Sequence, residues 1–153
     1  MTRYRTRLAA VCSELNAEEA RYVVFGATAM QLWGTTRATI DIDILIEPTV
    51  GNARRVLTAL GRTGLGLARE WLAEEVATKP VTVIGDSPRV DVFTVAWSVH
   101  FAEAAAHAAT FEIEGVKIPT ASIDDLIASK RTGRLQDAAD IEVLEEIRRL
   151  RGE

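Results

Sequence analysis

A chain of 153 residues is long enough to bury a hydrophobic core without disulfides or structural metals, and we expect residues 1–153 to form a single domain. Hydrophobic residues make up 48% of the sequence, charged residues make up 26% and the formal net charge is −4, so the composition carries no general signature of nucleic-acid binding. The single cysteine, Cys12, excludes an internal disulfide, and with only His100 and His107 beside it the sequence argues against a structural zinc site.

The basic start of the chain does not have the composition of a targeting segment. Its apolar run, LAAVC at residues 8–12, is too short for the core of a signal peptide, and acidic residues follow directly. No apolar run approaches the roughly 20 residues needed to cross a bilayer. We therefore expect a cytoplasmic protein with no membrane partner.

Hydrophobic periodicity predicts an α+β protein, with glycine and proline at the breaks between elements. Helices are predicted at residues 3–19, 27–34, 50–62, 99–108, 122–130 and 135–150, strands at 22–26, 40–46, 81–85 and 89–95, and a hairpin at 109–120. The hairpin is expected to turn at Glu114-Gly115, and Ser122 is the expected N-cap of its helix. In the last helix apolar residues recur at positions 135, 138, 141, 144, 147 and 150. We expect a small mixed β-sheet flanked by helices, with extra helices at both ends.

The segment IDIDILI, residues 40–46, places two carboxylates in an apolar strand. Alternate residues of a strand face opposite sides, so the isoleucines are expected in the core while Asp41 and Asp43 share the other face. The α-carbons of the two acids would lie roughly 6.5–7 Å apart. Like charges this close raise each other's pKa unless a cation lies between them, and a divalent metal ion is the commonest solution. The alternative is an edge strand whose outer face is simply solvated.

A second feature is the turn FGATAM, residues 25–30, where a strand leads into a helix. Gly26 allows the backbone to approach a ligand closely, and the free N–H groups at the start of a helix suit phosphate oxygens. Thr28 could add a hydroxyl group. The alternative is that Gly26 serves the turn geometry alone.

A third feature is Asp91 inside the strand RVDVFTV, residues 89–95. Taken alone, such an acid is more often an exposed strand residue than a ligand. Arg37 and Thr39 precede the acidic pair, and a guanidinium near two carboxylates suits a polyanion that is bridged through a metal. The three features lie at intervals along the chain that could converge on one site.

Taken together, these motifs resemble the nucleotidyltransferase superfamily with the DNA-polymerase-β-like fold. The closer resemblance is to a compact bacterial branch with the pattern G-G-x-A-x-x-x-x-G-x-x-R-x-T-x-D-I-D, which includes the AbiEii-like type IV toxin enzymes; here the segment reads GATAMQLWGTTRATIDID, residues 26–43. That branch also carries a helical lysine followed by R-x-x-D-x-x-D, matched here by Lys130, Arg134, Asp137 and Asp140. The resemblance spans residues 20–145. Ala27 departs from the usual glycine or serine, and Trp33 stands where relatives often have histidine.

The resemblance implies an enzyme that moves NMP from an NTP to an acceptor hydroxyl, with Mg²⁺ or Mn²⁺ as cofactor. The metal ligands and catalytic residues would be Asp41, Asp43 and Asp91, since Mg²⁺ needs few protein carboxylates when it keeps waters and takes phosphates as ligands. Asp91 would also assist deprotonation of the acceptor. The nucleotide-binding residues would be Gly26, Ala27, Thr28, Arg37, Thr39 and Lys130.

Several alternatives stay open at the level of sequence. The acceptor could be the 3′ end of a tRNA, a protein side chain or a small molecule such as an aminoglycoside, and a toxin–antitoxin or phage-defence setting with a cognate partner is implied by the resemblance alone. The rival class is a non-catalytic nucleotide- or partner-binding module that kept the fold. Lys130 could be a solvated helix residue, and Asp137 and Asp140 could serve only to cap the helix or to pair with Arg134.

Overall fold

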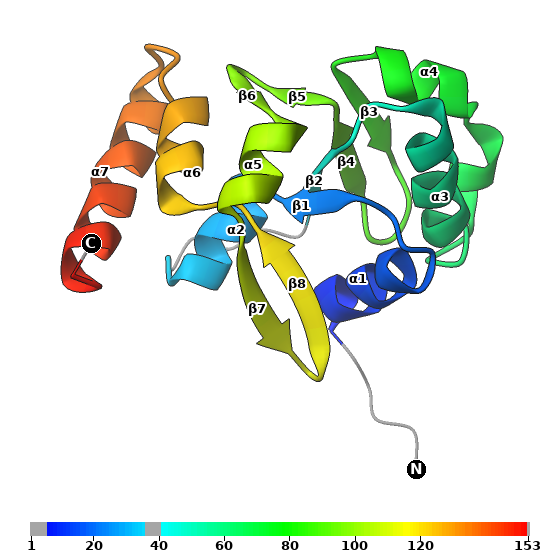
Figure 1. Cartoon of the computed structure of the whole chain (residues 1–153), viewed down its shortest axis with the longest axis horizontal. Coiled ribbons are helices and arrows are strands. Elements are labelled where there is room, and N and C mark those ends of the chain that lie inside the picture. Colours follow the sequence, from blue (N-terminus) through cyan, green and yellow to red (C-terminus); the bar gives the residue numbers. More distant parts are fainter. Residues whose placement is uncertain (1–5, 36–40, 153) are drawn as a thin grey trace.

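The computed structural model describes residues 6–35 and 41–152 and shows an α+β fold (Figure 1). Within these residues six strands form one mixed sheet in the order β3-β4-β2-β1-β8-β7, and two short strands form a separate hairpin. The strands are β1 (Tyr22–Val24), β2 (Ile42–Ile46), β3 (Val81–Ile84), β4 (Val90–Phe93), β5 (Val95–Ala96), β6 (Val99–His100), β7 (Ala109–Ile113) and β8 (Val116–Thr120). The helices are α1 (Arg7–Ala17), α2 (Gly26–Trp33), α3 (Val50–Leu60), the 3₁₀ turn η1 (Leu67–Glu70), α4 (Ala73–Thr78), α5 (Phe101–His107), α6 (Ile123–Ser129) and α7 (Leu135–Leu150). The predicted mixed sheet with helices at both ends of the chain is confirmed.

The centre of the sheet is built from segments that lie far apart in the sequence. Strand β2 runs antiparallel to β1 and parallel to β4, while β1 pairs in parallel with β8. The outer strands β3 and β7 are antiparallel partners of β4 and β8. The parallel register of β2 and β4 aligns Asp43 with Asp91. Two acids from distant parts of the chain therefore stand side by side on neighbouring strands.

One hydrophobic core runs through the sheet and its helices. The isoleucine face of β2 is buried as predicted, with Ile42, Ile44 and Ile46 each at most 4% exposed. Leu45 on the opposite face is also fully buried, so the carboxylate of Asp43 lies at the boundary between the core and the solvent. Helix α1 packs against α3 and β8, α5 against β1, and α7 against α6 (Figure 1). In the part of the chain that the structure describes, no helix combines the length and apolar character required to cross a membrane.

Local signals in the sequence set several element boundaries. Thr6, Thr49 and Ser122 cap α1, α3 and α6, and each hydroxyl accepts the backbone N–H three residues further on. The predicted cap Ser122 is thereby confirmed, and such a cap typically contributes about 1 kcal/mol. The β7–β8 hairpin turns at Glu114-Gly115 as predicted, with φ of 53° and 80° at the two residues.

The structure corrects the prediction in two places. Residues 95–100 form the β5–β6 hairpin, and α5 begins only at Phe101. Helix α7 has the predicted bounds, but Leu135 and Leu150 of its apolar series are 90% and 70% exposed. Its buried residues are Leu144, which belongs to that series, and two acids that do not, Asp137 and Asp140. Because an α-helix has 3.6 residues per turn, a long series at every third position rotates around the helix and cannot stay on one face.

Candidate active site

Gly26 and Asp43 are in close contact where β1 leads into α2. Gly26 has φ of +57°, in the left-handed region, and a Cβ on this residue would lie 2.5 Å from Oδ2 of Asp43. Both the backbone conformation and the space therefore require glycine here. The backbone N–H of Ala27 donates a hydrogen bond to the Asp43 carboxylate. The glycine turn thus holds an acidic side chain at the start of α2. The phosphate contact that the sequence predicts for this turn stays a prediction.

The pKa of Asp43 is raised from its ordinary value to about 6. Burial is the largest cause, followed by repulsion from Asp91 and then from Asp41. The Ala27 N–H and the positive charge of Lys130 act in the opposite direction. The ionised form of Asp43 is therefore disfavoured in the protein by itself, and a cation bound beside it would relieve the repulsion.

Thr28 bonds the backbone of Asp41 and Asp43 where β2 begins. Asp41 lies just before β2 and not inside it, because the strand begins at Ile42. The hydroxyl of the buried Thr28 donates to the backbone oxygen of Asp41 at 3.1 Å and accepts from the backbone N–H of Asp43 at 3.2 Å. The hydroxyl predicted to contact phosphate is thus engaged with the main chain, and it fixes the backbone that carries both acids.

Arg89 is a functional candidate that the sequence analysis missed. Its Nε donates to Asp91 Oδ1 at 2.9 Å and its Nη2 donates to Asp91 Oδ2 at 3.2 Å. The same Nε lies 3.8 Å from Asp41 Oδ2. The R-x-D spacing at residues 89–91 could have indicated this pair, since alternate residues of a strand share one face.

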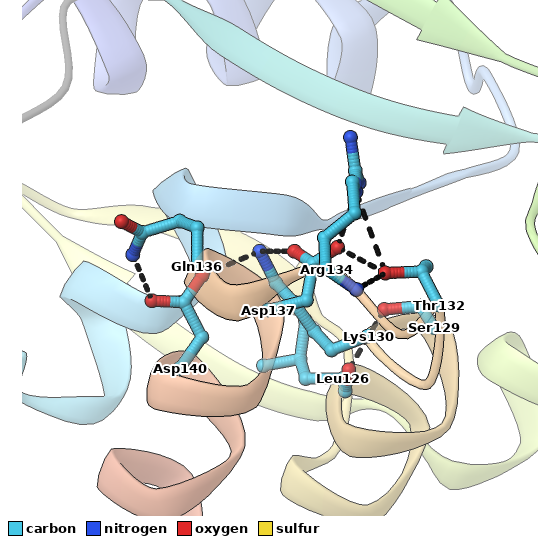
Figure 2. A network of polar contacts seen from close by, with 8 residues as sticks. All are labelled: Leu126, Ser129, Lys130, Thr132, Arg134, Gln136, Asp137 and Asp140. Carbon is cyan, nitrogen blue, oxygen red and sulfur yellow. Dashed lines mark hydrogen bonds and ion pairs between the residues drawn. The ribbon is translucent and has the colours of Figure 1, made fainter.

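Lys130 is held by two buried carboxylates of α7 (Figure 2). Its Nζ lies 2.9 Å from Asp140 Oδ2 and 3.7 Å from Asp137 Oδ1. Gln136 donates to the other oxygen of Asp140, and Arg134 Nε donates to Asp137 at 2.7 Å. Hydrogen bonding from Thr132 and then from Arg134, together with the charge of Lys130, holds the pKa of Asp137 below its usual value. The lysine side chain is only 16% exposed, so the reading of Lys130 as a solvated helix residue is wrong.

One pocket of about 170 Å³ joins these parts. Gly26 and Asp43 line it from the sheet side, and Lys130, Arg134 and Asp137 line it from α6 and α7. Asp41 and Asp91 adjoin Asp43 without lining this pocket. The fold therefore brings the predicted lysine to the predicted glycine turn, although the two lie a hundred residues apart. Arg37 and Thr39 lie outside the described residues, and their roles stay predictions.

The acidic residues described at this site have the donor type that a hard divalent cation prefers, but they are not arranged as a complete ligand set. Among residues 6–35 and 41–152, no three His, Cys, Asp or Glu side chains are arranged as a ready ligand set. The donors are nonetheless carboxylate oxygens that repel one another, which is the donor type that Mg²⁺ and Mn²⁺ prefer. Arg89 neutralises part of this charge and, with its side chain 47% exposed, has room to turn outward.

Comparison with known proteins identifies the fold. No family model matches the sequence, and no curated protein is significantly similar to it. Among solved structures, the crystal structure of an antigenic nucleotidyltransferase-like protein from Paracoccidioides brasiliensis is similar, with a TM-score of 0.62 and 17% sequence identity. The similarity covers 93% of this chain and 73% of that chain. At this identity the likeness bears on the fold alone: the chain has the α+β fold of a nucleotidyltransferase-like protein.

Proposed function

We propose that this protein is a nucleotidyltransferase that moves NMP from an NTP to an acceptor hydroxyl. One observation carries the proposal: Asp43 is aligned with Asp91 on parallel strands and lies at the glycine turn, in a pocket that also receives Lys130. Acids, a tight turn and a cation in one place are what transfer of a charged phosphoryl group requires. The nucleotidyltransferase-like fold supports the same assignment.

In the proposed reaction the acceptor oxygen bonds to the α-phosphorus while the bond from that phosphorus to the bridging oxygen of the β-phosphate breaks. Diphosphate leaves, and the proton of the acceptor passes to a carboxylate, for which we propose Asp91. Asp41, Asp43 and Asp91 would hold Mg²⁺ or Mn²⁺. When bound, the metal lowers the pKa of the attacking hydroxyl and neutralises the leaving group.

The chain's own cations would hold the triphosphate. Lys130 lines the pocket and is fixed by Asp137 and Asp140, so it would contact a phosphate there at little entropic cost. Arg37 and Thr39 are proposed to contact the same phosphates. Gly26 and Ala27 would bring the start of α2 within reach of the β- and γ-phosphates.

The acceptor and the biological setting are finer proposals. A tRNA 3′ end, a protein side chain and a small molecule are the acceptor classes to be tested. A cognate antitoxin or toxin partner, in a cytoplasmic toxin–antitoxin or defence system, follows from the sequence resemblance to AbiEii-like enzymes.

A specific observation favours the alternative, a non-catalytic nucleotide- or partner-binding module. The two-point ion pair between Arg89 and Asp91 occupies one of the proposed catalytic carboxylates. If Arg89 never releases Asp91, the acidic site would be a structural ion pair, and any nucleotide would bind without turnover.

Labelled nucleotides decide between the two. Each α-labelled NTP is offered to the protein with Mg²⁺ or Mn²⁺ and cell extract, with and without nuclease, beside the Asp43→Asn variant. Transfer predicts label in RNA, in protein or in a small molecule, with diphosphate released, and none of this in the variant. Nucleotide binding by calorimetry without label transfer from any NTP would leave the non-catalytic module.

A further inference from the structure

Trp97 has a backbone conformation that its side chain does not favour. Trp97 and Ser98 form the turn between β5 and β6, and Trp97 has φ of +59°. Turns of this kind normally carry glycine, asparagine or aspartate at positive φ, because a side chain with a Cβ is strained there. A large aromatic residue at this position is therefore not explained by the turn itself.

The indole is also exposed, which is unusual for the largest apolar side chain. Trp97 is 65% exposed. In the described part of the chain, Trp33 packs edge-on against Phe111 at 5.0 Å and Trp71 lies under Lys79 at 5.5 Å, whereas Trp97 has no such ring or cation contact. Packing therefore does not account for the strained conformation of Trp97, and strain of this kind is common at ligand-binding sites.

The ring lines the pocket that contains Asp43 and Lys130. This pocket has two chemically different walls: the apolar wall consists of Phe25, Phe93, Ala96 and Trp97, and the polar wall consists of Ser129, Lys130, Arg134 and Asp137. The β5–β6 hairpin stands between the α6–α7 pair and the strands of the acidic site (Figure 1). With about 170 Å³, the pocket is smaller than the roughly 300 Å³ of sites that enclose a whole drug-sized ligand, so it fits one part of a nucleotide.

We infer that Trp97 is a stacking platform for the nucleobase of the bound nucleotide, with the phosphates directed toward Lys130 and Asp43. The inference rests on the proposed function and adds to it the residue that recognises the base. Stacking on an indole tolerates any nucleobase, since every base has a π-face. The platform would therefore contribute to the affinity for the nucleotide more than to discrimination between bases.

Tryptophan fluorescence tests the inference directly, in the full chain. ATP and CTP are titrated beside inorganic tripolyphosphate, which has the charge of the nucleotide without its base. Stacking predicts that the nucleotides quench the fluorescence of Trp97 and that tripolyphosphate does not. Trp71→Phe is the matched control, because Trp71 lies outside this pocket, and its loss should leave the quenching unchanged.

Two variants separate binding from folding. Trp97→Gly removes the ring and relieves the positive φ, so the melting temperature should hold or rise while ATP affinity falls by roughly 5- to 150-fold, the range for loss of one stacked base. Trp97→Phe keeps a ring, so it should retain most of the affinity while losing the quenching signal. Tripolyphosphate affinity should be unchanged in both.

The outcomes distinguish this inference from the proposed function. If Trp97→Gly binds ATP like the parent while label transfer proceeds, the stacking role of Trp97 is wrong and the proposed nucleotidyltransferase function is retained. If nucleotides quench the fluorescence but no label is transferred, Trp97 stacks on the base in a protein that binds nucleotide without catalysing transfer. Failure of every nucleotide to bind the parent protein would overturn both.

Discussion

Arg89 donates to both carboxylate oxygens of Asp91, from Nε at 2.9 Å and from Nη2 at 3.2 Å, and the same Nε lies 3.8 Å from Asp41 Oδ2. The arginine therefore neutralises part of the charge that a divalent ion would neutralise in the proposed reaction. A metal ion bound at the proposed site would compete with Arg89 for the same carboxylate oxygens, so we expect the arginine to lower the affinity of the site for metal.

Removal of this competing cation should tighten metal binding. We expect Arg89→Gln to bind Mn²⁺ up to about fivefold more tightly than the parent, because an exposed ion pair is worth at most about 1 kcal/mol. Electron paramagnetic resonance of free Mn²⁺, in the absence of nucleotide, measures this. Arg62→Gln is the control, since Arg62 pairs with Glu14 of α1 and with Glu18 at the C-cap of that helix. Weaker Mn²⁺ binding in Arg89→Gln would instead make Arg89 a support for the ligands.

The raised pKa of Asp43 predicts how stability depends on pH in EDTA. Between the ordinary pKa of 3.8 and about 6, the folded protein keeps the Asp43 proton while the unfolded chain has lost it. The free energy of unfolding therefore falls as pH rises through this window, by roughly 3 kcal/mol at most. Asp43→Asn lacks this contribution, so its urea-unfolding curve should lose less stability between pH 4 and 6. Parallel pH profiles for the two proteins would show that Asp43 has no raised pKa.

Asp91 is predicted to separate turnover from binding. Asp91→Asn preserves the side-chain shape and removes the charge, so label transfer should be abolished while the Gly26 turn and Lys130 still hold some NTP. Calorimetry with ATP and Mg²⁺, run beside the transfer assay, provides both readouts. Asp124→Asn, at a 74% exposed side chain on α6, is the control that should leave both unchanged. If Asp91→Asn turns over like the parent, Asp91 has no catalytic role.

The sequence predicts the parts of the site that depend on local patterns. Gly26 is recognisable because it ends an apolar strand and opens a helix, and Asp43 because it interrupts a run of isoleucines. These signals also predicted the mixed sheet. The alignment of Asp43 with Asp91 follows once β2 and β4 are recognised as neighbours in the same sheet.

Contacts between distant segments could not be predicted in the same way. Helical spacing placed Leu135 among the core-facing candidates, yet Asp137 and Asp140 are buried because Lys130 supplies a cation to neutralise them. The exposure and the positive φ of Trp97 are likewise not revealed by anything local in the sequence. A partner across the fold decides each of these cases, and one sequence does not contain that partner's position.

The contact between Lys130 and Asp140 leads to the last prediction, which ties the stability of α7 to nucleotide binding. Asp140 does not line the pocket and is 4% exposed, so we expect it to affect the ligand through Lys130, to which it is ion-paired. Asp140→Asn keeps a hydrogen-bonding group of the same size while Asp137 still faces the lysine. We expect a loss of roughly 1–3 kcal/mol in unfolding free energy. Lys130→Met removes the cation that the two buried acids share, although Arg134 still pairs with Asp137, and it should lose more, on the order of 3–5 kcal/mol.

Nucleotide binding shows whether this contact also serves the site. A lysine that is held by Asp137 alone is less well positioned and should bind phosphate several-fold more weakly, so Asp140→Asn should raise the Kd for ATP and for tripolyphosphate while leaving that for adenosine unchanged. The exposed pair of Asp124 with Arg148 provides the matched control, and Asp124→Asn should change stability by less than about 0.5 kcal/mol and binding not at all. A variant Asp140→Asn that is destabilised yet binds tripolyphosphate like the parent would show that the two acids serve only to fasten α7 to α6. In that case Lys130 would be a structural cation, and the phosphate contacts of the proposed enzyme would have to come from Arg37 and the Gly26 turn.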